Sequence, residues 1–368
     1  MKILHIADLH LGKKTFGYSL LEDQRYFLDK TVDYLKDNQI NKLIIAGDIY
    51  DTASPSGDAI SLFDSFLTKL VNNKIEAFII SGNHDSKDRV GYLNNIVASQ
   101  GIHINSSIEN ALKPITSDNI NFYLIPYSSA SDINAAFETN YKNYNDALAY
   151  VINKMEINKE MTNIAIAHQL VLPTQSELEF GGSEEPVVGT ISNIPSSLFS
   201  DFDYVALGHI HKPQNVAKNA RYSGSPLAYH SDEAKYEKSY TIIEVNGKDL
   251  SIKTDKIIPL RDTKVLTGTF EDILTKNDAY KSCYIHAVIT DGDIPNAMEK
   301  LKQVFPYALS ISYLRHEGVG VNISEKIKDI ENISPNDLFS KLYTEQMGLE
   351  LTDYQKEIIN DLLKDGDE

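Results

Sequence analysis

Five short apolar runs of this chain each end in polar side chains that can bind a divalent metal ion. These side chains are Asp8 and His10, then Asp48, then Asn83, His84 and Asp85, then His168, and finally His209 and His211. Carboxylate, amide and imidazole ligands together, with no thiolate among them, suit Mn²⁺, Fe²⁺ or Zn²⁺ better than a site for Mg²⁺ alone. The pattern therefore predicts a transition-metal centre.

Seven of these residues are predicted metal ligands: Asp8, His10, Asp48, Asn83, His168, His209 and His211. Seven ligands are too many for one ion with open coordination positions, but they suit two ions that share one carboxylate. Two ions roughly 3.5–4 Å apart can clamp a phosphate and lower the pKa of a shared water, as phosphoester hydrolysis requires. In an extended segment, residues i and i+2 point the same way, so the D-x-H and H-x-H pairs can each bind one ion together.

Two further residues are assigned to catalysis. His84 directly follows a predicted ligand and need not be one itself, and an imidazole there could protonate the leaving oxygen. Asp51, three residues after Asp48, could hold that imidazole in the right tautomer and keep it cationic. Asp85 could be a helix cap as easily as a catalytic group and is left outside the predicted site.

Each motif also has an ordinary structural interpretation. Asp8 and His10 could form a turn with a surface imidazole. Asp48 could be a helix N-cap, and Asn83 a left-handed turn residue. His168 taken alone would more commonly be a core or surface histidine. The metal interpretation is favoured because all five motifs occur in order along one chain. The remaining histidines carry no pattern and are expected to be structural or solvated: His5, His103, His230, His286 and His316.

The elements that position these residues are predicted to be buried strands. The runs cover residues 2–7, 42–47, 77–82, 163–167 and 204–208. Each has the length and the Ile, Val and Leu content of a buried strand. In an open α/β sheet, ligands bind beyond the carboxyl ends of the strands, so five such ends predict one site. A glycine precedes Asp48, Asn83 and His209, which lets the backbone turn sharply and ions approach closely.

Residues 1–260 alternate strand and helix, which predicts parallel pairing with right-handed crossovers in a single α/β domain. One helix is predicted over residues 20–35. A second starts at Ser54-Pro55, where a side-chain cap precedes a proline at the first helical position. A hairpin over residues 240–260 is predicted to turn at Asn246-Gly247. Residues 172–195 are rich in Pro, Gly, Ser and Glu and predict a long loop beside the site.

A second unit is predicted over residues 261–317. Its predicted strands are 265–270, 283–290 and 308–314, and its helices 271–276 and 295–304. Residues 318–333 are a predicted linker. Residues 334–368 predict two helices, the second opened by the capping box Thr352-x-x-Gln355. These helices could pack on their own domain, but partner binding is favoured because short amphipathic helices need a surface to bury their apolar face.

The composition is that of an ordinary soluble protein, 42 % hydrophobic and 24 % charged over 368 residues. No apolar run approaches the roughly 20 residues that a membrane helix needs. The chain starts directly with a predicted strand, so no secretory signal is expected. The single cysteine, Cys283, excludes an internal disulfide framework and fits a reducing cytoplasm.

The formal charge of −17 argues against a basic nucleic-acid-binding surface. Part of this acidity lies in the predicted metal ligands, and residues 334–368 contribute nine acidic residues against three lysines, a net of −6. Lys13 and Lys14 follow the first motif and could touch a DNA backbone, although an ordinary solvated loop is nearly as well supported. A polyanionic substrate would therefore need attraction from metals or from a partner subunit.

The motifs D-x-H, G-D-x-x-D, G-N-H-D/E, H and G-H-x-H, in this order over residues 8–211, resemble those of the calcineurin-like metallophosphoesterases. Flanking sequence resembles, within that superfamily, the bacterial SbcD nuclease subunits. The segments that carry this likeness are KILHIADLHLG at 2–12, GDIYD at 47–51, YVALGHIHKPQ at 204–214 and YSGSP at 222–226. The resemblance covers nearly the whole chain and is weakest after about residue 260.

The resemblance implies a four-layer fold, in which helices flank a β-sandwich, with a small α+β capping domain and a helical partner-binding tail. By the family pattern, the first metal ion is held by Asp8, His10, Asp48 and His211. The second is held by Asp48, Asn83, His168 and His209. Asp48 then bridges the two ions, and His84 is the catalytic histidine.

The resemblance also implies an activity and partners. The family hydrolyses DNA phosphodiesters with Mn²⁺, as a 3′→5′ exonuclease on double strands and an endonuclease on single strands and hairpins. It works as a dimer bound to the SbcC ATPase, in a heterotetramer that processes DNA ends in repair and recombination. Two rival hypotheses are a small-molecule phosphodiesterase or phosphatase on the same fold and a metal-free scaffold. The extra domain argues against the first, and the intact ligand set against the second.

Overall fold

The predicted apolar runs form the central strands of two sheets, as the implied β-sandwich requires. The first sheet has six strands, in the order β16 (Asp249–Lys256), β15 (Ser239–Asn246), β1 (Lys2–Ile6), β4 (Lys42–Ala46), β5 (Glu76–Ile80) and β6 (Ile102–Asn105). The strands from β1 to β6 in this order are parallel, whereas β15 is antiparallel to β1 and to β16. The predicted parallel pairing is therefore confirmed.

The second sheet contains the other two runs. Its order is β13 (Gln214–Ala217), β14 (Ala220–Tyr222), β12 (Tyr204–Leu207), β9 (Thr162–Ala167), β8 (Ile120–Ile125) and β7 (Ile115–Ser117). Its four central strands are parallel and its two edge strands antiparallel. The five strand ends that carry the predicted ligands are thus divided between two sheets.

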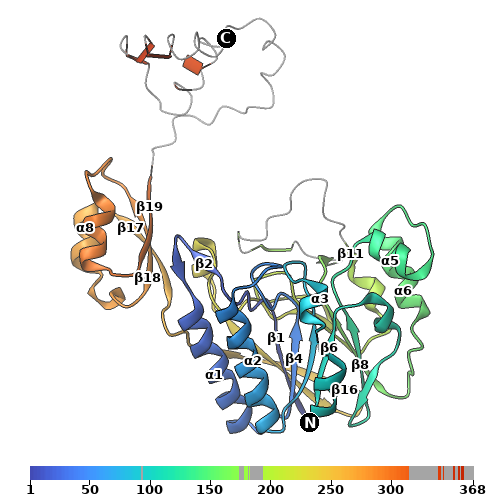
Figure 1. Cartoon of the computed structure of the whole chain (residues 1–368). Coiled ribbons are helices and arrows are strands. Elements are labelled where there is room, and N and C mark those ends of the chain that lie inside the picture. Colours follow the sequence, from blue (N-terminus) through green and yellow to red (C-terminus); the bar gives the residue numbers. More distant parts are fainter. Residues whose placement is uncertain are drawn as a thin grey trace, which may run out of the picture. The chain divides into compact units, whose positions relative to one another are not determined.

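The two sheets pack face to face with helices outside them. Side chains from both sheets share one buried cluster, in which the rings of Phe78 and Phe122 stack with centroids 3.7 Å apart. The helices α1 (Leu21–Asp37) and α2 (Gly57–Asn72) bury their apolar sides against the first sheet. The helices α5 (Ala130–Phe137) and α6 (Tyr144–Lys154) cover the second. Figure 1 shows these four layers, and they confirm the predicted fold class.

The start of one predicted helix and the turn of the predicted hairpin are each shifted along the chain. The second helix starts at Gly57, not at Pro55, because Ser56 is the extended N-cap residue and its Oγ accepts a hydrogen bond from Ala59 N at 3.3 Å. The predicted hairpin forms, but its strands end at Asn246 and resume at Asp249. The turn therefore lies at Gly247 and Lys248, and Gly247 adopts the positive φ of 59°.

The elements predicted between residues 261 and 314 are present. They are β17 (Thr263–Gly268), α7 (Phe270–Lys276), β18 (Tyr284–Ile289), α8 (Ala297–Val304) and β19 (Ala308–Tyr313), and the strands form a sheet in the order β17-β18-β19. The remaining short elements are β2 (Lys14–Thr15), β3 (Tyr18–Ser19), α3 (Lys87–Val90), α4 (Asn94–Val97), β10 (Val171–Leu172), β11 (Ile194–Pro195), η1 (Ala98–Gln100), η2 (Ile108–Leu112), η3 (Ser196–Phe199), η4 (Ser231–Lys235) and η5 (Asp278–Tyr280).

This computed structural model describes a defined part of the chain. The described residues are 1–92, 94–173, 178–180, 182, 194–314, 339, 340, 343, 351, 352, 355, 356, 358 and 359. The predicted linker at 318–333, most of the loop at 172–195 and most of the tail lie outside them. Contacts divide the chain into one unit of residues 1–288 and 294–312 and another of 289–293 and 313–368. The boundaries 1–260, 261–317 and 334–368 stay predictions.

Two local features complete the description. The predicted capping box in the tail forms, since Thr352 N donates to Gln355 Oε1 at 2.9 Å and Gln355 N donates to Thr352 Oγ1 at 3.3 Å. None of the helices in the described residues combines the length and the apolar character needed to cross a membrane.

Candidate active site

The predicted ligands gather where the carboxyl ends of the two sheets meet. Four of them have left-handed backbone, with φ of 54° at Asp8, 44° at His10, 48° at Asp48 and 99° at His209. This conformation is uncommon for residues other than glycine and costs about 1–3 kcal/mol each. Main-chain bonds hold it: Asp8 N donates to Gly47 O at 3.1 Å and His10 N to Asp48 O at 3.0 Å. The loops are thus fixed in a strained shape that aims their side chains inward.

Two of the predicted glycines are required because another segment of the site approaches each of them closely. A Cβ atom at Gly82 would lie 2.1 Å from Asp48 Oδ1, and one at Gly208 would lie 1.9 Å from the carbonyl oxygen of Ala46. Both distances are far inside van der Waals contact. A larger residue at either position would push apart the loops that carry the ligands.

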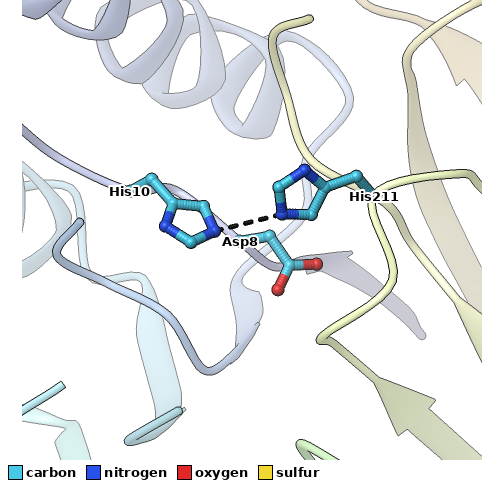
Figure 2. Close-up of side chains that lie close together, drawn as sticks. All are labelled: Asp8, His10 and His211. Carbon is cyan, nitrogen blue, oxygen red and sulfur yellow. Dashed lines mark hydrogen bonds between the residues drawn. The ribbon is translucent and has the colours of Figure 1, made fainter. Parts of the chain in front are cut away.

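The first group of donors consists of Asp8, His10 and His211, all buried (Figure 2). The Nε2 atoms of His10 and His211 face each other at 3.1 Å. Asp8 Oδ1 accepts a hydrogen bond from His209 N at 2.8 Å, and no hydrogen bond from the described residues reaches its buried Oδ2. One carboxylate oxygen and two imidazole nitrogens thus converge, which fits the donor set of a divalent cation.

A second group lies beside the first and contains Asn83, His168 and His209. Asn83 Oδ1 lies 3.0 Å from His168 Nε2 and 3.0 Å from His209 Nδ1. The other ring nitrogen of His168, Nδ1, lies 2.7 Å from the carbonyl oxygen of Ala46. Since that oxygen can only accept, Nδ1 of His168 carries a proton, and Nε2 is the ring nitrogen that points towards the site.

Asp48 lies between the two groups. Its Oδ2 is 3.6 Å from His10 Nε2 and 3.3 Å from His168 Nε2, so one oxygen faces an imidazole of each group. Its Oδ1 accepts a hydrogen bond from His84 N at 2.9 Å. The same carboxylate also belongs to two clusters of possible metal donors, one with His10 and His84 and one with Asp8 and His168.

His84 is held differently from the prediction. Its Nδ1 lies 2.9 Å from the main-chain carbonyl oxygen of Asp51, and its ring is exposed with an edge against His10 at 4.8 Å between centroids. The carboxylate of Asp51 turns instead to His10 Nδ1 at 3.5 Å and Lys13 Nζ at 2.9 Å. The backbone of Asp51 therefore orients His84, while its side chain supports His10.

Burial sets the protonation of the imidazoles. It lowers the pKa of His10 to about 4 and that of His209 to about 3, so both are neutral at pH 7 and offer a lone pair. Burial also raises the pKa of the Asp8 carboxyl to about 7. With its imidazoles neutral and its carboxylates ionised, the cluster can accept a cation.

The pKa of His168 is shifted in the opposite direction, upwards. Burial alone would lower its pKa, but the charges of Asp48 and Asp8 outweigh burial and raise the pKa to about 9. The protonated ring is thus the counter-ion of Asp48, whose own pKa is held well below its usual range by His168 despite burial. A bound cation would take over this neutralisation and release the proton.

Asp85, which the sequence analysis left outside the site, fixes two of its loops. Its carboxylate accepts hydrogen bonds from Ile49 N at 3.0 Å, Tyr50 N at 2.9 Å and Gly82 N at 2.8 Å. Burial, with the nearby charge of Asp48, raises its pKa to about 6. Its place in the G-N-H-D motif was the available signal for this role.

Two further positioning residues escaped the sequence analysis. Gln24 of α1 donates from Nε2 to the carbonyl oxygens of Leu9 at 3.2 Å and His10 at 2.7 Å, and its Oε1 accepts from Gly12 N at 3.0 Å. Glu233 of η4 is buried, with Oε1 at 3.0 Å from Nδ1 of a predicted ligand, His211. Neither residue belongs to a motif, and no spacing in the sequence points to them.

Comparison with known proteins agrees with this geometry. Residues 1–213 match the calcineurin-like phosphoesterase family, and residues 259–347 match the type 5 capsule protein repressor C-terminal domain. The chain is 32 % identical over 380 residues to the D protein of the SbcCD nuclease of Staphylococcus saprophyticus subsp. saprophyticus, and the match covers 100 % of both chains.

Two solved structures are also similar. One is TT1561 of Thermus thermophilus, with a TM-score of 0.44 and 12 % identity, and the other is a dimetal phosphatase from Danio rerio, with a TM-score of 0.38 and 13 % identity. Each match covers 70 % of this chain and 99 % of the other.

The family match over residues 1–213 and the full-length relative confirm the predicted enzyme class, a metal-dependent phosphodiester hydrolase. The predicted resemblance to the SbcD subunits is confirmed as well. The chain belongs to the calcineurin-like phosphoesterases and, within them, to the family of the SbcD nuclease subunits.

Proposed function

We propose that this chain is a Mn²⁺-dependent DNA nuclease subunit. It cleaves phosphodiester bonds at the site where the carboxyl ends of its two sheets meet. The observation that carries the proposal is the position of Asp48 Oδ2, which faces His10 Nε2 at 3.6 Å and His168 Nε2 at 3.3 Å. A carboxylate shared in this way suits a pair of ions. The full-length relative, named a nuclease subunit, supports a nucleic acid as the substrate.

The proposal divides the donors into two sets that share Asp48. The first set is Asp8, His10, Asp48 and His211, and the second is Asp48, Asn83, His168 and His209. In support, the ligand atoms of Asp8, His10 and His211 lie within 4.8 Å of one another, and His10 faces Asp48 at 3.6 Å. In the second set, Asn83 lies 3.0 Å from both histidines, and His168 lies 3.3 Å from Asp48. Together the two sets contain four imidazoles and no thiolate, and such donors favour Mn²⁺ over Mg²⁺.

His84 is the proposed proton donor to the leaving oxygen. When bound, two divalent ions would neutralise the phosphate charge and lower the pKa of the attacking water. The Nδ1 of His84 donates to the carbonyl oxygen of Asp51, which leaves Nε2 to carry and release the proton. The ring is exposed and lies against His10, so it can reach a substrate without being a ligand itself.

The finer activities and partners follow from the same family. We infer a 3′→5′ exonuclease on double strands and an endonuclease on single strands and hairpins, working in the cytoplasm with an SbcC-type ATPase. The tail at 334–368 is its proposed binding segment. A homodimer within a heterotetramer is supported by exposed apolar side chains after Asp48 and Asn83, namely Ile60, Tyr92 and Ile96, with exposed fractions of 45 %, 73 % and 64 %.

Digestion of end-labelled linear duplex DNA tests the proposal. The purified chain would be incubated with Mn²⁺ or EDTA, with and without the ATPase subunit, alongside bis-p-nitrophenyl phosphate. We expect DNA cleavage that needs Mn²⁺. Cleavage of the small diester alone, even with the ATPase present, would instead support a small-molecule phosphodiesterase. A chain that cannot be loaded with Mn²⁺ and cleaves neither substrate would support a scaffold.

A further inference from the structure

The imidazole of His211 is held from behind by a buried carboxylate. Its Nδ1 lies 3.0 Å from Glu233 Oε1, while its Nε2 points towards His10. Glu233 is only 1 % exposed. Because an ionised carboxylate only accepts hydrogen bonds, this contact places the ring proton on Nδ1 and leaves the lone pair of Nε2 directed into the first donor group.

Glu233 is in turn fixed by its own partners. Its Oε2 accepts from Lys238 Nζ at 2.5 Å and from Ser225 Oγ at 3.1 Å. Lys238 also donates to Ser225 Oγ at 2.7 Å and to the carbonyl oxygen of His211 at 3.2 Å. The Lys238 ammonium therefore links the Glu233 carboxylate to the main chain of His211, the residue whose ring this carboxylate supports. Both charges are buried, so each needs the other.

A looser contact, at ion-pair distance and without a hydrogen bond, lies behind the other imidazole of the first group. Asp51 Oδ1 lies 3.5 Å from His10 Nδ1 and accepts a hydrogen bond from Lys13 Nζ at 2.9 Å. The second group differs, because His168 Nδ1 faces a neutral main-chain carbonyl oxygen. A charged acceptor raises the basicity of an imidazole ligand more than a neutral one does. The two donor groups are thus supported unequally.

We propose that Glu233, held in place by Lys238, is a positioning residue that fixes the tautomer and orientation of His211 and so strengthens the first of the two metal positions selectively. The inference rests on the proposed two-metal site. It adds that removal of the Glu233 charge weakens the binding of one metal ion and leaves the binding of the other unchanged. Loss of such a partner typically lowers metal affinity about 10–100-fold.

Two measurements on the full chain with Glu233→Gln test this. Calorimetric titration with Mn²⁺ should give two ions in the wild type, and in the variant one of them should bind at least about tenfold more weakly. Nitrogen-15 NMR of the metal-free chain should show His211 protonated on Nδ1 in the wild type and a mixture of tautomers in the variant. Glu237→Gln is the matched control, since Glu237 is exposed and pairs only at the surface with Lys256.

Glu233→Asp covers the case in which the glutamine variant does not fold. It keeps a charge beside Lys238 but withdraws the carboxylate from His211, so the same ion should weaken. Two ions bound with wild-type affinity, or an unchanged tautomer, in the folded variants would overturn the inference. A wild-type chain that binds no Mn²⁺ would refute the proposed function instead, and the tautomer measurement would still decide whether Glu233 orients His211.

Discussion

Asp48 Oδ2 lies 3.3 Å from His168 Nε2, although Asp48 follows a strand of the first sheet and His168 a strand of the second. The contact joins the carboxyl ends of both sheets through one buried charge pair. The opposed pKa changes of the two residues express the same coupling, with that of His168 raised to about 9 and that of Asp48 lowered. A site divided between two sheets depends on the residue that both of its halves share.

Asp48→Asn should therefore abolish binding of both ions. The substitution keeps the shape of the side chain but removes the charge that faces His10 and His168, and an amide oxygen is a much weaker bridging ligand. Calorimetric titration with Mn²⁺ measures the result. Asp58→Asn, at an exposed position in the first turn of α2, is the control and should bind as the wild type does. Two ions per chain in Asp48→Asn would contradict the bridging assignment.

His84→Gln should retain Mn²⁺ binding and lose most of its turnover. A positioned general acid contributes about 10²–10⁴-fold to rate, and glutamine cannot release a proton. The ring nevertheless lies in a cluster with His10 and Asp48 that could hold a metal, so binding and cleavage must both be measured. A nuclease assay beside a Mn²⁺ titration does this, with His103→Gln as the control. Weakened metal binding would make His84 a ligand instead.

Asp85→Ala should destabilise the fold and the site together. The substitution leaves three main-chain donors, at Ile49, Tyr50 and Gly82, without their charged acceptor. Unsatisfied buried donors of this kind cost about 1–3 kcal/mol each, so we expect the free energy of unfolding to fall by roughly 3 kcal/mol or more. Urea titration would measure it, with Asp88→Ala on the exposed side of α3 as the control. An unchanged midpoint would show that water replaces the carboxylate without loss.

The strands and their polar ends could be predicted because the signal is local. An apolar run followed by a turn residue specifies a strand end wherever it occurs, and the order of the motifs then gives the ligands. The division into two sheets could not be predicted from β9 and β12 themselves, since both are buried on both faces and carry no alternation that would assign a partner sheet.

The supporting residues escaped the sequence analysis for a different reason. Gln24 lies within a predicted helix, where a polar residue normally faces solvent, yet it is only 1 % exposed because the loop from Leu9 to Gly12 folds over it. Glu233 reaches His211 from a 3₁₀ turn whose position depends on the tertiary packing. Contacts of this kind join segments far apart in the chain and leave no spacing to read.

His5, which was expected to be structural or solvated, lies fully buried between the sheets, with Nδ1 at 3.1 Å from the hydroxyl oxygen of Tyr204. Burial, with the charge of Arg221, lowers its pKa to about 3. The folded chain therefore keeps His5 neutral down to that pH, whereas the unfolded chain takes up a proton below about pH 6.5. Its contribution to stability is complete above about pH 6.5 and is lost as the pH falls towards 3.

His5→Phe should flatten this dependence, because it keeps a ring in the core and removes the titrating group. Each pH unit below about 6.5 costs about 1.4 kcal/mol for one such histidine, so between about pH 6.5 and 5 the wild type should lose about 2 kcal/mol more than the variant. Urea unfolding in EDTA at the two pH values measures the difference. His230→Phe, at a partly exposed position, controls for loss of a histidine in general. Equal losses in wild type and His5→Phe would show that His5 does not titrate between the two states.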